Sequence, residues 1–136
     1  STPCVITTNG LTKVYARRPG GGRAALTLVE GTWQDGAGRF ELHQEGGNWV
    51  LWAQDGTVET YNGGGQPVST RDEGGVGLNF TYDGTGKLTQ IAHTAGQTMS
   101  FTWTGNKVTS IVGPDAKTYT FAYSGQGYLQ TVTLPE

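Results

Sequence analysis

The sequence is short of cysteine, charge and long apolar runs, and each shortage excludes a class of protein. Its single cysteine, Cys4, excludes an internal disulfide and any site built from several cysteines. Charged residues make up only 15% of the 136 residues and the net charge is −2, which favours neither a nucleic acid nor an anionic membrane as partner. No apolar run approaches the roughly 20 residues of a membrane span. The first residues also lack the basic-then-apolar layout of a signal peptide.

Stretches that could form helices are scarce as well. Glycine contributes 23 residues, far above the roughly 7% of an average protein, and interrupts almost every stretch before a helix of ordinary length could form. We therefore predict an all-β protein that is large enough to form a single hydrophobic core.

What the second half of the sequence has instead is a repeat with a period of about 20 residues. Three aromatic pairs define it: Phe80 and Tyr82, Phe101 and Trp103, Phe121 and Tyr123. Each pair is followed by an aliphatic pair: Leu88 and Ile91, Val108 and Ile111, Leu129 and Val132. A unit this short cannot bury its own apolar face, so its copies must stack on one another. We expect the six aromatic residues to have a structural role.

Each repeat is predicted to be a β-hairpin. Apolar and polar residues alternate strictly in Thr118–Tyr123, which is typical of a strand with its rings on one face. The glycine-rich segments between strands predict turns at residues 62–66, 83–86, 104–106 and 124–127. Leu88 and Ile91, however, are three residues apart and would point to opposite faces of a flat strand. Either a β-bulge or a strand covered on both faces would explain this spacing.

Two regions are expected along the chain. Residues 1–55 form an N-terminal β-hairpin region, with one hairpin running from Phe40 across Gly46-Gly47 to Trp52. Residues 56–136 form four repeats, and the first is degenerate, because Glu59 and Arg71 take positions that are apolar in the other copies.

The run Tyr82-Asp83-x-x-Gly86-Lys87-Leu88-Thr89-x-Ile91, followed by Gly96, resembles the tyrosine–aspartate (YD) repeat of RHS proteins. The resemblance is good over residues 56–136 and weaker over residues 31–55. Some positions differ from the pattern: Asn62, Thr104 and Ser124 replace the aspartate, and Ala116 replaces a glycine. An aspartate that can be replaced in this way points to turn chemistry rather than to catalysis.

The resemblance implies a curved antiparallel sheet of hairpin repeats that is part of an RHS-type β-shell. Such shells often enclose a toxin domain in bacterial polymorphic toxins. We therefore expect a non-enzymatic structural fragment that encloses or displays a toxin or effector domain, in a secreted or delivered bacterial protein. The expected partners are the remainder of the shell, the toxin and, through the strand edge at residues 129–134, a second copy of the chain.

The sequence gives little support for a catalytic function. His43 and His93 are the only imidazoles and lie in no recognisable motif, and Asp55, Asp72 and Glu73 lie in glycine-rich turns. We predict no catalytic residues, no metal site and no cofactor. One basic cluster consists of Lys13, Arg17, Arg18 and Arg23. It is more typical of a solvated loop or an interface than of a nucleic-acid site.

A carbohydrate-binding module is the alternative hypothesis. Trp49 and Trp52, with Trp33 nearby in the sequence, could present exposed rings on which sugars stack. Packing in a core is the default role of such large aromatic residues, and the sequence leaves both roles open.

Overall fold

The computed structural model describes residues 6–9, 13–18, 22–29 and 32–135, and every regular element among them is a β-strand. The prediction of an all-β antiparallel fold is confirmed. The chain divides into two compact units, an N-terminal unit of residues 1–77 and a C-terminal unit of residues 78–136. The predicted division at residues 55 and 56 concerns where the repeat sequence begins, and it stays a prediction. Among the described residues no helix is long and apolar enough to span a membrane.

The N-terminal unit is a meander in which each strand pairs antiparallel with the next. Its strands are β1 (Ile6–Asn9), β2 (Lys13–Arg17), β3 (Arg23–Val29), β4 (Thr32–Gln34), β5 (Phe40–Glu45), β6 (Asn48–Ala53), β7 (Val58–Tyr61) and β8 (Pro67–Arg71). The predicted hairpin of residues 40–52 is present as β5 and β6. Gly46 and Gly47 both have positive φ in its two-residue turn, which only glycine adopts without strain.

The hydrophobic core lies in the N-terminal unit. Leu26 of β3, Leu42 of β5, Leu51 of β6 and Tyr61 of β7 are almost fully buried and form one cluster with Ala24. Leu42 lies directly opposite Leu51, and Leu51 lies opposite Glu59, so the apolar row across β5 and β6 ends at a carboxylate on β7. This places one buried acidic group beside the core.

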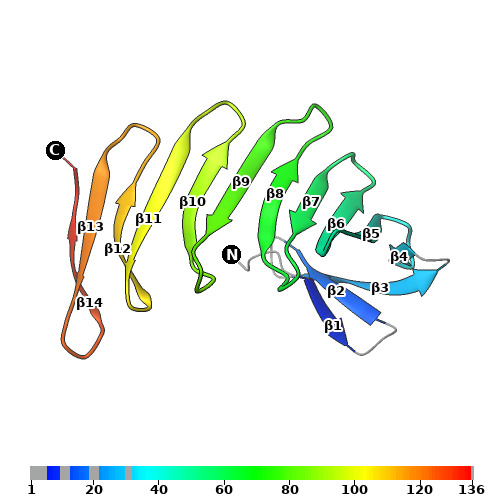
Figure 1. Ribbon diagram of the computed structural model, residues 1–136, viewed down its shortest axis with the longest axis horizontal. Helices are drawn as coiled ribbons and strands as arrows, with labels where there is room; N and C mark the ends of the chain where they lie inside the picture. Colours follow the sequence, from blue (N-terminus) through cyan, green and yellow to red (C-terminus); the bar gives the residue numbers. More distant parts are fainter. Residues whose placement is uncertain (1–5, 10–12, 19–21, 30–31, 136) are drawn as a thin grey trace. The chain divides into compact units, whose positions relative to one another are not determined.

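The C-terminal unit is formed by the last three repeats, whose strands lie side by side in sequence order (Figure 1). They are β9 (Gly77–Tyr82), β10 (Leu88–His93), β11 (Thr98–Thr104), β12 (Lys107–Val112), β13 (Thr118–Tyr123) and β14 (Leu129–Thr133). β9 begins at the last residue of the N-terminal unit. The predicted turns at residues 62–66, 83–86, 104–106 and 124–127 all join consecutive strands. Exposure alternates along β13 as the sequence pattern predicts, with the rings on the covered face.

The phenylalanines of the three repeats lie on alternate strands, β9, β11 and β13, and each is half-buried. An aliphatic strand separates each pair of aromatic strands. Ile91 pairs with Phe80 and Ile111 pairs with Phe101 in register. The row is therefore mixed aromatic and aliphatic, and no large residue in it is fully buried, since the described residues of this unit form a single layer.

A β-bulge explains the three-residue spacing of the aliphatic pairs. Leu88 pairs with Tyr82 and Ile91 with Phe80, because the register shifts between Leu88 and Gln90 and leaves Thr89 as an extra residue. The other hairpins carry the same shift at Val68, Thr109 and Gln130. Of the two explanations that the sequence leaves open, the structure supports the bulge. The extra residue returns both aliphatic side chains to the aromatic face.

The degenerate repeat follows the same register as the other three. Glu59 occupies the phenylalanine position, as expected, and Thr70 lies opposite it. Arg71 pairs with Val58. Arg71 therefore takes the register position of Ala92 and Val112, which is apolar in two of the other three repeats.

Seven turns in the two units share one hydrogen-bond pattern. The backbone amide of the first residue donates to the carbonyl of the residue four positions later. The carbonyl of the first residue accepts from the amide of the residue three positions later. They begin at Ala53, Asn62, Asp72, Asp83, His93, Gly113 and Ser124. The aspartate of the YD pattern accepts with its Oδ1 from the amides of Thr85 and Lys87, at 2.9 and 3.0 Å. Asn62 and Asp72 make the equivalent bonds. Asp83 is thus a turn residue, and other side chains with an acceptor replace it.

The fourth residue of these turns has a positive φ and is glycine in all but one case, Ala116, whose φ is 64°. A left-handed conformation costs a residue with a Cβ roughly 1–2 kcal/mol. We expect Ala116→Gly to raise the free energy of unfolding by about 0.5 kcal/mol, after the added entropy of the unfolded chain is subtracted. Urea unfolding measures the change. Ala95→Gly is the matched control, because Ala95 lies in the preceding turn without a positive φ, and its replacement should destabilise.

Candidate functional site

Successive repeats of the C-terminal unit are joined by a hydrogen bond from an aromatic side chain to a backbone carbonyl. Trp103 donates its indole N–H to the carbonyl of Leu88 at 2.8 Å. One repeat later, Tyr123 donates its hydroxyl to the carbonyl of Val108 at 2.6 Å. In both cases donor and acceptor are 15 residues apart, and the acceptor is the residue immediately before the bulge. The second aromatic position of the repeat therefore requires Tyr or Trp, whereas the first position needs only an apolar ring.

We expect Tyr123→Phe to lower the free energy of unfolding by about 1 kcal/mol, because the substitution removes one hydrogen bond and keeps the ring. Urea unfolding followed by tryptophan fluorescence would measure the loss. Tyr119→Phe is the control on the same strand, since no described residue bonds its hydroxyl. Equal effects of the two substitutions would show that the bond to Val108 does not stabilise the unit.

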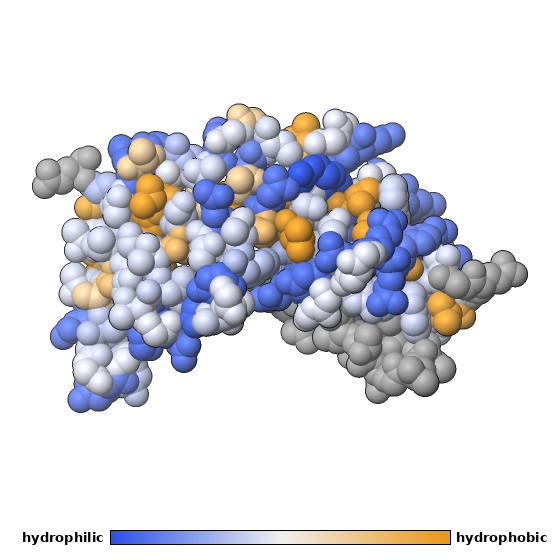
Figure 2. All heavy atoms as spheres, in the orientation of Figure 1, coloured by the Kyte–Doolittle hydropathy of each residue, from blue (hydrophilic) through white to orange (hydrophobic). Residues whose placement is uncertain are grey.

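Charge is nearly absent from the strands of the C-terminal unit. Between residues 78 and 135 the charged residues are Asp83, Lys87, Lys107, Asp115 and Lys117. All lie in turns except Lys107, the first residue of β12, whose ammonium lies 5.1 Å from the centre of the Tyr123 ring. Figure 2 agrees, since pale residues of intermediate hydropathy dominate the face of β11 to β14 in view, with orange apolar patches among them. Both faces of these strands are thus electrically neutral.

The aromatic face of this unit has a hollow of about 190 Å³ at the end of the strands opposite the YD turns. Leu78, Ile91, Met99 and Pro114 line it together with His93, Gln97 and Thr98. The Nδ1 atom of His93 accepts the Ala95 amide at 2.9 Å, which fixes the proton of the neutral ring on Nε2. The hollow can accommodate one apolar side chain, but it holds no pair of groups arranged for acid–base chemistry.

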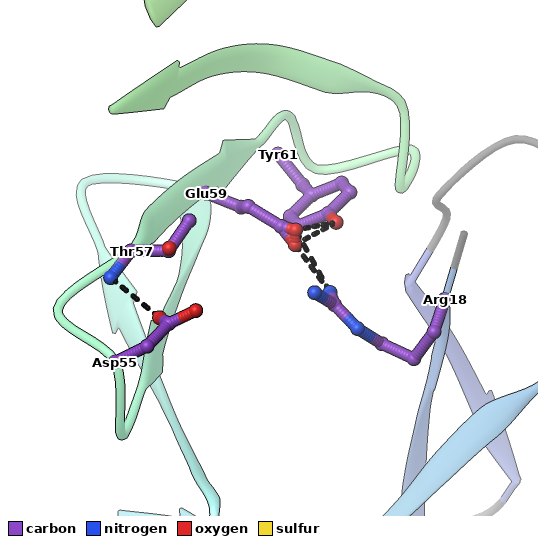
Figure 3. Close-up of polar contacts among 5 residues, drawn as sticks. All are labelled: Arg18, Asp55, Thr57, Glu59 and Tyr61. Carbon is purple, nitrogen blue, oxygen red and sulfur yellow. Dashed lines mark hydrogen bonds and ion pairs between the residues drawn. The ribbon is translucent and has the colours of Figure 1, made fainter. Parts of the chain in front are cut away.

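In the N-terminal unit, the buried carboxylate of Glu59 accepts hydrogen bonds from two sides (Figure 3). Arg18 reaches it with Nη1, 41 residues away in the sequence, and the hydroxyl of Tyr61 donates to it at 3.2 Å. The guanidinium of Arg18 also stacks on the ring of Phe40, 4.9 Å from its centre. Figure 3 shows Arg18 and Tyr61 converging on Glu59, with the Asp55–Thr57 bond apart from them. Glu59 thus forms an ion pair with Arg18 and accepts a hydrogen bond from Tyr61. The ion pair links the loop after β2 to β7.

Among the described residues Asp35 is the other buried acidic residue, and it stabilises the turn between β4 and β5. Its carboxylate accepts the amide of Phe40 at 3.0 Å and the Nε–H of Arg39 at 3.1 Å. Burial by itself raises the pKa of Asp35, but the hydrogen bonds from Phe40 and Arg39 outweigh it and hold the pKa below its ordinary value.

A carboxyl with a lowered pKa stabilises the fold above its unfolded-state pKa of about 4, and this stability is lost as the pH falls through the lower folded-state pKa. Asp35→Asn cannot titrate. We therefore expect the stability of the wild type to fall more steeply than that of Asp35→Asn below about pH 4. Urea midpoints at a series of pH values would measure both slopes, and parallel slopes would contradict the prediction.

The three predicted sugar-stacking tryptophans are placed differently. Trp33 and Trp49 pack against the core and form an edge-to-face pair with ring centres 6.5 Å apart. Trp52 on β6 is 47% exposed. The structure therefore brings Trp33 and Trp49 together as packing residues and leaves Trp52 apart from them as the accessible ring.

The remaining sequence candidates form no catalytic constellation among the described residues. The Nε2 atom of His43 lies 3.6 Å from the carboxylate of the exposed Glu41, and no described nucleophile is bonded to His43. Within the described part of the chain no three His, Cys, Asp or Glu residues could share a metal ion. Of the basic cluster only the side chain of Arg18 is described, and it is engaged by Glu59. Cys4 and the side chains of Lys13, Arg17 and Arg23 lie outside the described residues.

Sequence reasoning missed the ion pair of Arg18 and Glu59 and the role of Tyr61. One signal was available, because Glu59 stands at a position that is phenylalanine in three other repeats. A carboxylate at an apolar position predicts a buried partner. Nothing in the sequence indicates that the partner is Arg18, since the bond depends on how the strands of the N-terminal unit pack.

Comparison with known proteins agrees with this geometry. None of the curated proteins compared with the chain matches it. The family model of the Teneurin YD-shell matches residues 43–136, which include all four repeats and most of the hairpin before them. The match covers more than half of the 136 residues. With its hairpin repeats, bulges and YD turns, the chain belongs to the Teneurin YD-shell family.

Proposed function

We propose that this chain is a wall segment of a larger YD-shell, which encloses or displays a toxin or effector domain and does no chemistry itself. The observation that carries the proposal is the repeated joint between hairpins. Each of the last two repeats donates an aromatic N–H or O–H to the carbonyl that precedes the bulge in the repeat before it. Such a joint can be repeated without limit, so the sheet can be extended by any number of repeats.

The neutral strands support a role as a wall. Charged side chains of residues 78–135 lie in the turns or at the start of β12, so the faces present hydroxyls, amides and rings. A wall of this kind can lie against another domain without burying an unpaired charge, which would be costly. We propose a secreted or delivered bacterial protein as the setting, in which the rest of the shell and the enclosed domain are the partners.

The test uses the protein encoded by the complete natural reading frame. Electron microscopy is expected to show a hollow particle, and limited proteolysis is expected to spare a domain inside it. Denaturing the particle before proteolysis is the control and should expose that domain. A compact particle without an interior, or equal cleavage before and after denaturation, would contradict the proposal.

The carbohydrate-binding alternative now depends on Trp52, the exposed member of the three tryptophans. A glycan array with the wild type and Trp52→Ala tests it, and Trp49→Phe is the matched control in the packed pair. Specific binding that is lost only in Trp52→Ala would favour the sugar module over the wall.

A further inference from the structure

One row of side chains crosses four neighbouring strands of the N-terminal unit. Glu41 of β5 lies directly opposite Trp52 of β6. Val58 of β7 follows Trp52 in the row, and Arg71 of β8 follows Val58. Directly opposite side chains share a face of the sheet, with Cβ atoms roughly 4.5–5.5 Å apart. Glu41 and Trp52 each adjoin a core leucine in the sequence, so this row lies on the face away from the core.

The ring of Trp52 and the carboxylate of Glu41 are both accessible. Trp52 is 47% exposed, and the side chain of Glu41 is 53% exposed. No described cation stacks on the Trp52 ring. The basic nitrogen that the structure places against the Glu41 carboxylate is Nε2 of His43, at 3.6 Å, which is too long for a hydrogen bond. Arg71, two strands from Trp52, donates its Nη1 to the carbonyl of Thr70 at 2.7 Å.

The N-terminal unit holds two guanidinium groups, each with an aromatic ring and a carboxylate. Arg18 stacks on Phe40, 4.9 Å from the ring centre, and pairs with Glu59. Arg39 lies 5.9 Å from the centre of the same ring, and its Nε donates to Asp35 at 3.1 Å. In both cases the ring attracts the delocalised charge and the carboxylate accepts the N–H groups. The exposed ring and carboxylate on β6 and β5 provide the same two components without a guanidinium.

We propose that Trp52 and Glu41 form a docking site for an arginine side chain of a partner protein. Tryptophan attracts a cation more strongly than other aromatic side chains, and a guanidinium within roughly 6 Å of its ring can reach a carboxylate on the neighbouring strand. Arginine fits better than lysine, because its planar group stacks on the ring and donates two parallel N–H bonds to one carboxylate. A sugar would use the ring but not the charge of Glu41, so charge complementarity favours arginine.

The experiment adds the blocked peptide acetyl-Gly-Arg-Gly-amide to the full chain labelled with ¹⁵N. The indole N–H groups of the four tryptophans are followed by NMR, and Trp52→Leu identifies the signal of Trp52 by its loss. Because Trp52 is exposed, this variant should fold. Acetyl-Gly-citrulline-Gly-amide is the matched control peptide, since citrulline keeps the planar shape of arginine and carries no charge.

The arginine peptide is expected to shift the Trp52 signal and to leave the other indole signals in place. The citrulline peptide should bind about five- to tenfold more weakly, because both the cation–π attraction and the ion pair require the charge. Glu41→Gln should weaken binding of the arginine peptide about two- to fivefold. Glu45→Gln is the matched control variant and should leave binding unchanged. Glu45 has the same charge and lies at the end of the same strand, opposite Asn48 rather than a ring.

Equal binding of the arginine and citrulline peptides would overturn the proposal, because the charge would then play no part. Equal weakening by Glu41→Gln and Glu45→Gln would also overturn it, since the effect would come from the net charge of the chain. A shift of the Trp52 signal by an oligosaccharide, with none from the arginine peptide, would identify a sugar as the occupant. Each of these results would leave the wall proposal standing, because the test of that proposal does not involve Trp52.

Discussion

Replacing Glu59 with leucine is expected to lower the free energy of unfolding by about 3 kcal/mol, because it removes the buried carboxylate that Arg18 and Tyr61 share. Breaking one side of a buried ion pair costs more than the pair itself is worth, since the other charge loses its compensation. Urea unfolding of both proteins at neutral pH measures the loss.

The double variant Arg18→Met and Glu59→Leu should recover at least half of this loss, because neither charge is then buried alone. Glu45→Leu is the matched control. Glu45 lies exposed at the end of β5, and its replacement should change stability by less than about 0.5 kcal/mol. If the double variant were as unstable as Glu59→Leu, the cost would come from packing around residue 59 and not from the unpaired charge.

Gly77→Ala is the second substitution with a large expected effect. A Cβ at Gly77 would overlap the carbonyl oxygen and carbon of Thr70, and these backbone atoms cannot turn away as a flexible side chain could. The backbone must move instead, and we expect a loss of about 3 kcal/mol in the free energy of unfolding. Thermal and urea unfolding would both detect it.

Gly84→Ala is the matched control, because nothing lies within 4 Å of a Cβ built at Gly84. Gly84 also lacks the positive φ that penalises alanine in these turns. Its replacement should change stability by less than about 0.5 kcal/mol. Similar losses for the two variants would show that the close approach of Gly77 and Thr70 does not limit the packing.

Local sequence patterns were sufficient to predict the strands and turns of the repeats. Alternation of rings and small polar residues in 118–123 predicts a strand that the structure contains as β13, and glycine-rich segments predict the four turns. These features depend on neighbours within a few residues, so the sequence displays them directly. The replacement of Asp83 by Asn62 or Ser124 in other copies also indicated its turn role, which the hydrogen bonds of all three confirm.

The spacing of Leu88 and Ile91 marks the limit of what a local sequence pattern can predict. The sequence shows that something unusual separates them, but a bulge and a doubly covered strand predict the same spacing. Only the pairing register distinguishes the two, because it shows which residue lies opposite Tyr82 and which lies opposite Phe80. The same register shows that Thr70 lies opposite Glu59.

By itself the sequence determined the all-β class, the 20-residue period, the turns and the membership of a YD-repeat family, because each follows from residues close together in the chain. Tertiary structure alone decided that Arg18 meets Glu59, that Trp52 and not Trp49 is exposed, and that Trp103 and Tyr123 bond the carbonyls beside the bulges. These contacts join residues 15 to 41 positions apart. They depend on how strands stack and where each bulge shifts the register, which no single repeat contains.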